Sequence, residues 1–208
     1  SLGFKVYRLG APVVLSDSLP MLEHMGVRVM GEDNFRMHSS HGDGSAIAMH
    51  DFKLDAPASD EIEPEALARL FEETFGSVFR GEVENDDFNR LVLRAGLAAQ
   101  DIVVLRAYAK YCKQIGFALS QATIEATLAA QPHIARMLVK LFHLRLHPTE
   151  HDDGAAGAQV NAIEQALDRV SNLNEDRVRR QLVALIQATL RTNFFRTGVG
   201  HSGAPGAR

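Results

Sequence analysis

Apolar residues recur at steps of three and four from Phe79 to Phe142, and this periodicity constrains the fold more than any other feature of the chain. Residues three and four apart lie on one face of a helix, so the spacing predicts consecutive helices that pack on one another. Gly96, Gly116 and Pro132 punctuate the stretch. Glycine and proline at such places mark where one helix ends and the next begins. The pattern predicts a helical module and by itself indicates no chemistry.

The first 58 residues differ from everything after them. Ser16 or Asp17 is expected to cap a short helix, and Gly26 is expected to end it. The predicted order is a strand at Lys5–Leu9, this helix through Met25, a strand at Val27–Met30 and a strand at Ser45–Leu54. Strand, helix, strand, strand is most of a ferredoxin-like layer. The fold class predicted for the whole chain is therefore α+β, with a small βαββ module followed by an all-α module.

Composition shifts predict the boundaries between these modules. The acidic, proline-containing stretch Asp55–Glu63 is typical of a linker, and no convincing strand follows Pro64. His147–Ala158 (HPTEHDDGAAGA) is the most loop-like stretch, predicted to connect two helical blocks. The tail from Thr197 is glycine-rich and has no apolar anchors. We expect a βαββ module at 1–58, a helical module at 59–196 and a tail or linker at 197–208.

The overall composition is that of a soluble globular protein. The 208 residues are 46% hydrophobic and 23% charged, with a net charge of −4. This negative charge provides no global attraction to nucleic acid or to an anionic membrane. No apolar run reaches the roughly 18–20 residues that span a bilayer. The single cysteine, Cys112, excludes an internal disulfide framework and fits a reducing compartment, so a cytoplasmic location is expected.

The side chains that could bind a metal or perform catalysis have a structural interpretation in each case. His38, His41 and His50, with Asp43 and Asp51, form the densest set of potential metal ligands, but two of the histidines flank a hairpin-like HGDG turn. A polar hairpin is the favoured interpretation, and no metal site is predicted.

Nucleophilic and cofactor chemistry is likewise not indicated. Cys112 lies on the apolar face of a predicted helix, which favours a buried, inert thiol. The carboxylate pair Asp86–Asp87 is assigned to a solvated helix end. The sequence contains no nucleophile elbow, no phosphate loop and no glycine-rich dinucleotide turn after a strand. We therefore predict no catalytic, cofactor-binding or metal-binding residue in this chain.

Two features allow a binding function as an alternative. Ser120 caps a short predicted helix after a glycine-containing turn, as in a helix-turn-helix, and Gln121, Thr123 and Glu125 would then face DNA bases. That helix carries no Lys or Arg, although phosphate contacts normally dominate DNA affinity. The clusters Arg106–Lys113 and Arg177–Arg180 are interpreted as solvated basic faces that could dock an acidic neighbour. A free-standing helical module that binds protein or DNA remains the alternative function.

Several long phrases resemble one known family. The runs GEVENDDFNRLVLRAGL, LRAYAKYCKQIGFALSQATIEATLAAQPHIARMLVKLF and EDRVRRQLVALIQATLRTNFF resemble the large bacterial NAD-specific glutamate dehydrogenases. The runs VYRLGAPVVLSDSLPMLEHMGVRVM and IAMHDFKL are similar to the ACT-like module that precedes their helical region. The resemblance covers nearly all of residues 4–196. In that family the residues that bind glutamate and NAD follow a TLRTNFF-like stretch, which here is Thr189–Phe195, so no catalytic residue is carried over.

The resemblance to ACT-like modules implies an amino-acid effector site at the first strand–helix turn. The corresponding residues here are Gly10, Ala11, Pro12, Val13 and Ser16. ACT modules usually have a glycine after the proline of this turn, whereas Val13 and Val14 follow Pro12 here. A purely structural module is therefore the alternative to an effector sensor.

From the resemblance we expect a non-catalytic regulatory or architectural segment of an NAD-dependent glutamate dehydrogenase. The full-length enzyme would oxidise L-glutamate to 2-oxoglutarate and ammonia with NAD, whereas this segment alone would be inactive and would hold no cofactor. Its expected partners are the catalytic domain of the same chain, further copies in a homo-oligomer and an amino-acid effector. Neither nucleic acid nor membrane is expected as a partner.

Overall fold

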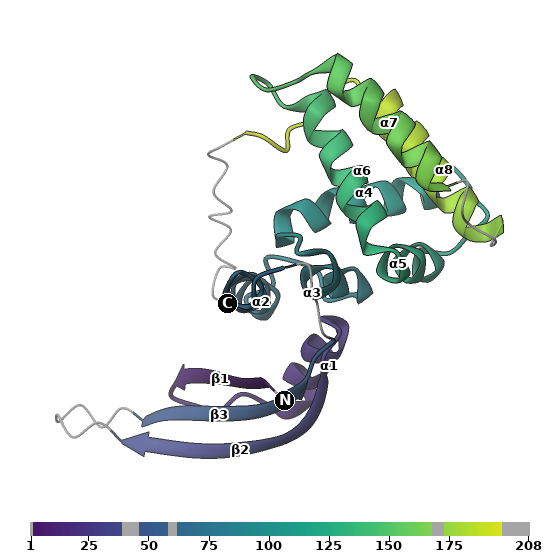
Figure 1. The fold of residues 1–208 in the computed structure, drawn as a ribbon. Coiled ribbons are helices and arrows are strands. Elements are labelled where there is room, and N and C mark those ends of the chain that lie inside the picture. Colours follow the sequence, from purple (N-terminus) through teal and green to yellow (C-terminus); the bar gives the residue numbers. More distant parts are fainter. Residues whose placement is uncertain (1, 39–45, 58–61, 168–172, 197–208) are drawn as a thin grey trace, which may run out of the picture.

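The computed structural model describes residues 2–38, 46–57, 62–167 and 173–196. A small antiparallel sheet lies at one end of the molecule and a stack of helices rises from it (Figure 1). The sheet module consists of β1 (Leu2–Leu9), α1 (Leu15–His24), β2 (Arg28–His38) and β3 (Ala46–Asp55). The helical part consists of α2 (Pro64–Phe79), the 3-10 helix η1 (Asp87–Arg90), α3 (Leu91–Ala95), α4 (Ala99–Gln114), α5 (Gln121–Ala130), α6 (Pro132–Leu146), α7 (Asp153–Leu167) and α8 (Leu173–Ala188). The predicted α+β fold, a βαββ module followed by helices, is confirmed.

The strands pair in the order β1–β3–β2, so β3 lies between the two strands that α1 connects. Both pairings are antiparallel, and Phe4 pairs with Phe52 while Glu32 pairs with the same residue from the other side. Alternate side chains of β3 are buried, from Ala48 to Leu54. This alternation is the period of a strand with one covered face. The side chains on one face of the sheet therefore belong to the hydrophobic core, and those on the other face do not.

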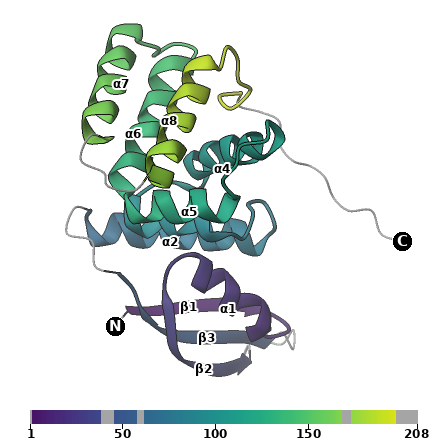
Figure 2. The same ribbon diagram turned by 90° about the vertical axis from the view of Figure 1, so that its right-hand side faces the viewer.

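Two helices cover the buried face of the sheet. The α1 helix crosses it, and α2 lies beside α1 at the boundary between sheet and helices (Figure 2). Phe4 of β1 meets the rings of Phe71 and Phe75 of α2 edge to face, at centroid distances of 5.2 and 5.0 Å. Edge-to-face contact is a favourable arrangement of aromatic rings because it brings a positive edge to a negative face. A single hydrophobic core consequently runs from the sheet through α2 into the helical part.

Local signals place several helix ends where the sequence predicted them. Pro64 and Pro132 stand in the first turns of α2 and α6, where a missing N–H costs nothing. The Ser120 hydroxyl accepts the Thr123 N–H at 3.2 Å and caps α5 as predicted. Gly96 ends α3 with φ +60°, and a Cβ there would lie 2.6 Å from Ile62 Cδ1. Both the left-handed backbone and the close approach of Ile62 require glycine at this position.

Two local expectations were wrong. Neither Ser16 nor Asp17 caps α1, because the helix begins at Leu15 and its N-cap, Val14, makes no side-chain cap bond. The loop expected through Ala158 is also shorter than predicted, because α7 already begins at Asp153. The Asp152 carboxylate accepts the Ala155 N–H at 2.9 Å, which caps a run of helix-favouring alanines. The glycines in this run suggested a loop. The cap and the alanines nevertheless stabilise a helix here.

Candidate functional site

The first strand–helix turn, where the resemblance placed an effector site, is tied into the sheet. Gly10 adopts φ +87° and donates its N–H to Ala46 O at 2.8 Å. Val13 is buried, and its N–H donates to His50 Nε2 at 2.9 Å. Ser16, by contrast, is exposed on α1 and lies outside these contacts. Two backbone donors of the turn are thus already used within the chain.

His50 holds this turn from the middle of the sheet. Its side chain is fully buried, stacks on Phe52 and places Nδ1 2.7 Å from Glu32 Oε1. Because Nε2 accepts the Val13 N–H, the ring proton belongs on Nδ1, from which it is donated to Glu32. Glu32, His50 and Val13 therefore form one chain of hydrogen bonds from β2 through β3 to the turn. An incoming carboxylate would have to displace His50 to use the Val13 amide.

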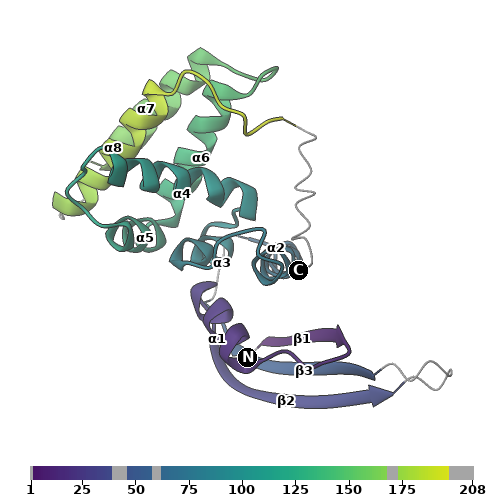
Figure 3. The ribbon, with the colours of Figure 1, turned by 180° about the vertical axis from the view of Figure 1, so that it is seen from behind.

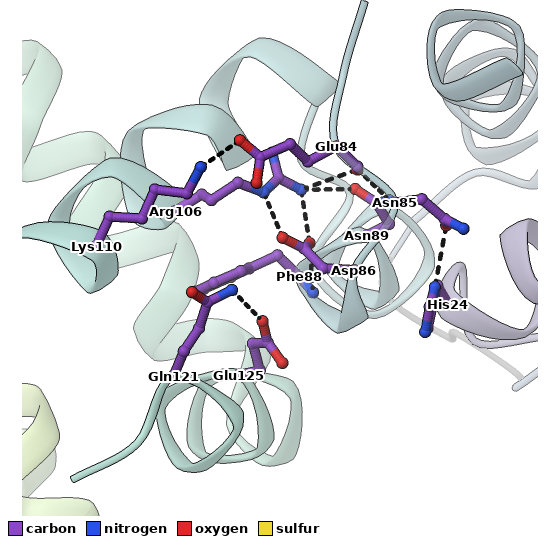
Figure 4. A network of polar contacts seen from close by, with 10 residues as sticks. All are labelled: His24, Glu84, Asn85, Asp86, Phe88, Asn89, Arg106, Lys110, Gln121 and Glu125. Atoms are coloured by element: carbon purple, nitrogen blue, oxygen red, sulfur yellow. Dashed lines mark hydrogen bonds and ion pairs between the residues drawn. The ribbon is translucent and has the colours of Figure 1, made fainter. Parts of the chain in front are cut away.

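A second polar cluster, which we call the Arg106 network, joins the segment before η1 to α4 (Figure 4). Arg106 is 3% exposed, and it donates from Nε and Nη2 to the two carboxylate oxygens of Asp86, both at 2.7 Å. Nη2 also donates to Asn89 Oδ1 at 3.0 Å, and the guanidinium lies over the Phe88 ring at 5.7 Å from its centroid. A bidentate arginine–carboxylate pair fixes both orientation and distance. The network thereby locks the irregular segment that leads into η1 onto α4.

Asp86 has a second task within the same network. Its Oδ1 accepts the Phe88 N–H at 3.2 Å, so the carboxylate that pairs with Arg106 also caps η1. Asn89 donates to Glu84 O at 2.9 Å, and the Glu84 carboxylate pairs with Lys110. On the other side, His24 of α1 hydrogen-bonds Asn85 at 3.0 Å. The segment 84–89 therefore connects the sheet module, through α1, to the helical part, through α4.

Glu125 of α5 faces this network from below (Figure 4). It is 8% exposed and accepts a hydrogen bond from Gln121 at 2.8 Å. Burial raises the pKa of the Glu125 carboxyl, the Gln121 bond opposes the shift, and the nearby charges of Asp86 and Asp87 add to it. Of the three side chains proposed to read DNA bases, Glu125 is buried and accepts the Gln121 bond, and the Thr123 hydroxyl is paired with Ser120 at the start of α5. This geometry gives no support to a recognition helix.

A groove lies between α4 and the segment that ends α8. Its volume is about 720 Å³, and it runs over Val103, Ala107 and Tyr111 on one wall and over residues 185–196 on the other. At its base Tyr108 and Thr189 hydrogen-bond at 2.7 Å, and Arg191 and Arg196 contribute cationic side chains to the lining. The rings of Phe142, Phe194 and Phe195 cluster beside it, with centroids 4.9 to 5.8 Å apart. The groove is thus mainly apolar, with positive charge in the same segment that forms its second wall.

Three residues of α4 line this groove at a four-residue spacing that was not recognised in the sequence. Val103, Ala107 and Tyr111 are each four apart and all exposed, with values of 40% for Val103 and 48% for Tyr111. They form a second apolar stripe beside the buried one that contains Ile102, Leu105, Ala109 and Cys112. A step of four residues along a helix is detectable in the sequence. The described residues cover the buried stripe and leave the second stripe exposed at the groove.

The remaining candidate residues are separated or occupied. His50 lies on the covered face of the sheet, whereas Asp51 lies on the opposite face, where it pairs with Lys5; His41 and Asp43 lie outside the described residues. Among the residues described, no group of three His, Cys, Asp or Glu side chains could hold a metal ion. Cys112 is fully buried as predicted, and burial raises the pKa of its thiol. No helix in the described part of the chain is long and apolar enough to cross a membrane.

The basic faces expected on α4 and α8 were partly wrong. Arg106 is buried in its network, and Arg179 is fully buried with its guanidinium 3.0 Å from Glu175 Oε2. Burial lowers the pKa of Arg179, and the neighbouring Glu175 and Asp176 carboxylates oppose the shift. Asp86 is likewise not a solvated helix end. These charges stabilise the inside of the helical part and are not free to dock a partner.

Comparison with family models assigns classes to the parts of this fold. Residues 1–67 match the glutamate dehydrogenase ACT3 domain, and residues 83–148 match helical motif 3 of glutamate dehydrogenase. Residues 162–205 match the catalytic domain of bacterial NAD-glutamate dehydrogenase. The β1–α1 turn therefore lies in the part that matches the ACT3 domain, and the Arg106 network lies in the part that matches helical motif 3. The groove has α4 of the helical motif on one side and a segment matched to the catalytic domain on the other.

Individual relatives agree with these assignments. The chain is 41% identical over 192 residues to the NAD-specific glutamate dehydrogenase of Halomonas elongata, 40% over 196 residues to that of Pseudomonas aeruginosa and 39% over 199 residues to that of Mycobacterium tuberculosis. Each comparison covers 92% of this chain and 12% of the relative. The chain is thus homologous to one segment of the NAD-specific glutamate dehydrogenases, and the resemblance noted in its sequence is confirmed.

Proposed function

We propose that this chain is a non-catalytic, architectural and regulatory segment of a full-length NAD-dependent glutamate dehydrogenase. That enzyme would convert L-glutamate, water and NAD⁺ to 2-oxoglutarate, ammonia, NADH and a proton in the cytoplasm. The names of the related enzymes support the activity, and the matches to the ACT3 domain and to helical motif 3 support the regulatory assignment. The segment's contribution is to position the catalytic domain of the same polypeptide.

The groove beside α4 is the observation that carries this proposal. Its first wall belongs to helical motif 3 and its second wall to the stretch that matches the catalytic domain. Both walls carry exposed apolar surface, and Arg191 and Arg196 provide positive charge. Exposed apolar surface in a groove favours a packed partner, and an amphipathic helix with acidic side chains fits this chemistry. We assign that occupant to the catalytic domain.

We propose that NAD binds to a part of the full-length enzyme outside the described residues. A dinucleotide site of the Rossmann type needs a parallel βαβ unit with a glycine-rich turn at the helix N-terminus. The pairings in the described sheet are antiparallel, and the β1–α1 turn has the sequence LGAPVVL. These residues do not fit the cofactor, so no step of the reaction is assigned to them.

Substituting Tyr111 by Glu in the full-length enzyme tests the docking proposal. A charge on the apolar stripe should lower glutamate-dependent NAD reduction by about tenfold or more, because a few side chains carry most of the binding energy of an interface. The 208-residue chain with the same substitution should keep its melting temperature, since Tyr111 is 48% exposed and needs no repacking. Leu173→Glu is the matched control, because Leu173 is 72% exposed and lies outside the groove lining. Full activity of the Tyr111→Glu enzyme would overturn the proposal.

The ACT3 domain itself is proposed to act as a scaffold, with an amino-acid sensor as the alternative. The use of the Val13 N–H by His50 supports this choice. A thermal-shift screen of the chain against the common amino acids and 2-oxoglutarate tests it, because a ligand at a hundredfold excess over its Kd adds about 2.7 kcal/mol of stability. No shift is expected. A selective shift that is lost when Gly10–Ser16 is altered would instead make this turn an effector site.

A further inference from the structure

One hydrogen bond that ties the β1–α1 turn to the sheet ends on a titratable ring. The α1 helix lies on the side of the sheet that faces the helical part, and the turn leads the chain onto this side (Figure 3). Val13 donates its N–H to His50 Nε2 at 2.9 Å, and both residues are buried. The second ring nitrogen, Nδ1, lies 2.7 Å from Glu32 Oε1, and the Glu32 side chain is 15% exposed. Each nitrogen of the ring thus has one partner, an amide donor on one side and a carboxylate on the other.

Protonation of His50 would act on its two hydrogen bonds in opposite ways. The neutral ring carries its proton on Nδ1, because the Val13 amide can only donate. The imidazolium carries a proton on both nitrogens, so its bond to the Glu32 carboxylate becomes a charge-assisted one and is stronger. At Nε2, by contrast, an N–H then meets the N–H of Val13, and two donors whose nitrogens lie 2.9 Å apart cannot form a hydrogen bond. The added proton therefore strengthens the contact with β2 and breaks the contact with the turn.

Glu32 is the charged side chain in contact with the His50 ring. The other charged side chains of the strands that share this face are Arg8 of β1 and Arg36 of β2, each two positions beyond the residue that pairs with His50. Arg8 donates to Pro12 O at 3.4 Å, so it holds the same turn. The charged side chains of the two covering helices are exposed, namely Asp17 and Glu23 of α1 and Glu65, Arg69, Glu72 and Glu73 of α2, and His24 at the far end of α1 is bonded to Asn85. The charge of His50 is thus balanced mainly by Glu32.

We infer that His50 is a pH-sensitive latch on the β1–α1 turn. The latch is closed while the ring is neutral and accepts the Val13 N–H. It opens when the ring takes up a proton, and the turn around Val13 then leaves the sheet while the Glu32–His50 pair stays in place. Histidine is the side chain whose charge ordinarily changes between about pH 5 and 8, which sets the range for a test. The inference rests on the sheet module alone and depends neither on the groove beside α4 nor on the activity of the full-length enzyme.

Amide hydrogen exchange of the 208-residue chain, followed by NMR at about pH 7.5 and about pH 5, tests the inference. Relative to the intrinsic exchange rate at each pH, the protection of the Val13 N–H should fall by about tenfold or more in acid, because its acceptor is lost. The Gly10 N–H is the matched reference, since it donates to the Ala46 carbonyl, which does not titrate, and its protection should change little. Equal protection of Val13 at both pH values would overturn the inference. A loss of its protection while the His50 ring is still neutral by NMR would overturn it as well.

Two variants distinguish the latch from a general loosening of the chain in acid. His50→Gln offers an acceptor oxygen to Val13 and an N–H to Glu32 but does not titrate in this range, so Val13 should stay protected at both pH values. Glu32→Gln removes the carboxylate that stabilises the imidazolium, so the turn should be released at a lower pH than in the wild type. Circular dichroism at both pH values checks that each variant keeps its fold. A pH-dependent loss of protection that persists in His50→Gln, or a release that does not move to lower pH in Glu32→Gln, would contradict the latch.

Discussion

Removing the Asp86 carboxylate should destabilise the chain far more than removing an exposed partner of an ion pair. Arg106 is 4% exposed at its side chain and Asp86 17%, so Asp86→Ala leaves a buried guanidinium without its anion. Breaking a buried pair in this way typically costs about 3–5 kcal/mol. The same substitution removes the cap of η1, which adds about 1 kcal/mol. We expect a total loss of about 4–6 kcal/mol in the free energy of unfolding.

Equilibrium urea unfolding of the 208-residue chain, followed by circular dichroism, measures this loss. Glu82→Ala is the matched control, because Glu82 pairs with Arg80 at 2.7 Å while both side chains are more than half exposed. Exposed pairs contribute about 0–1 kcal/mol, so the control should change the unfolding midpoint little. Coincident transitions by fluorescence and circular dichroism would justify a two-state analysis.

A double variant separates the lost pair from the stranded charge. Asp86→Ala combined with Arg106→Met should be more stable than Asp86→Ala alone, because methionine fills the site without an unpaired charge. A cost below about 1 kcal/mol for Asp86→Ala would refute the reasoning, since that is the behaviour of a solvated pair. A double variant less stable than the single one would refute the account of the stranded charge.

Two further predictions concern other buried polar groups. His50→Ala should lower the free energy of unfolding by about 2–5 kcal/mol, because it leaves a cavity and removes the acceptor of the Val13 N–H. Amide hydrogen exchange in the β1–α1 turn should become faster. Unchanged exchange would show that His50 does not hold the turn. Glu125→Gln should stabilise the chain at neutral pH. Burial raises the pKa of the Glu125 carboxyl in the folded state above its unfolded value of about 4.3. The contribution of the protonated carboxyl to stability is therefore fully present below the unfolded value and is lost as the pH rises through the folded-state pKa. The free energies of unfolding of the variant and the wild type should therefore differ at neutral pH and become equal in acid. A difference that grows in acid would contradict the assignment.

The architecture could be predicted because its signals are local. The switch from alternating to helical periodicity near Pro64, the prolines that start α2 and α6, and the Ser120 cap all act within a few residues of one another. Gly96 could be predicted as a helix end from its type, but the close approach of Ile62 could not. The start of α7 was missed because glycine content outweighed the Asp152 cap in the sequence interpretation.

The polar sites could not be predicted because their partners are distant in the chain. Arg106 pairs with Asp86, which lies twenty positions earlier in the chain, and His50 accepts a hydrogen bond from Val13, which lies thirty-seven positions earlier. Nothing in the neighbourhood of an arginine in a helix distinguishes a solvated side chain from a buried one until the packing is known. The exposed apolar stripe of Val103, Ala107 and Tyr111 was detectable by its four-residue step, but the sequence interpretation recognised only the buried stripe of α4.

Hydroxyl-radical footprinting of Tyr111 tests whether the catalytic domain occupies the groove beside α4. In the 208-residue chain this side chain is 48% exposed at the wall of the groove and should be oxidised readily. In the full-length enzyme we expect the catalytic domain to protect Tyr111, whereas Leu173, an exposed reference outside the groove lining, should be oxidised equally in both. Equal oxidation of Tyr111 in the chain and in the full-length enzyme would contradict the claim that this groove positions the catalytic domain.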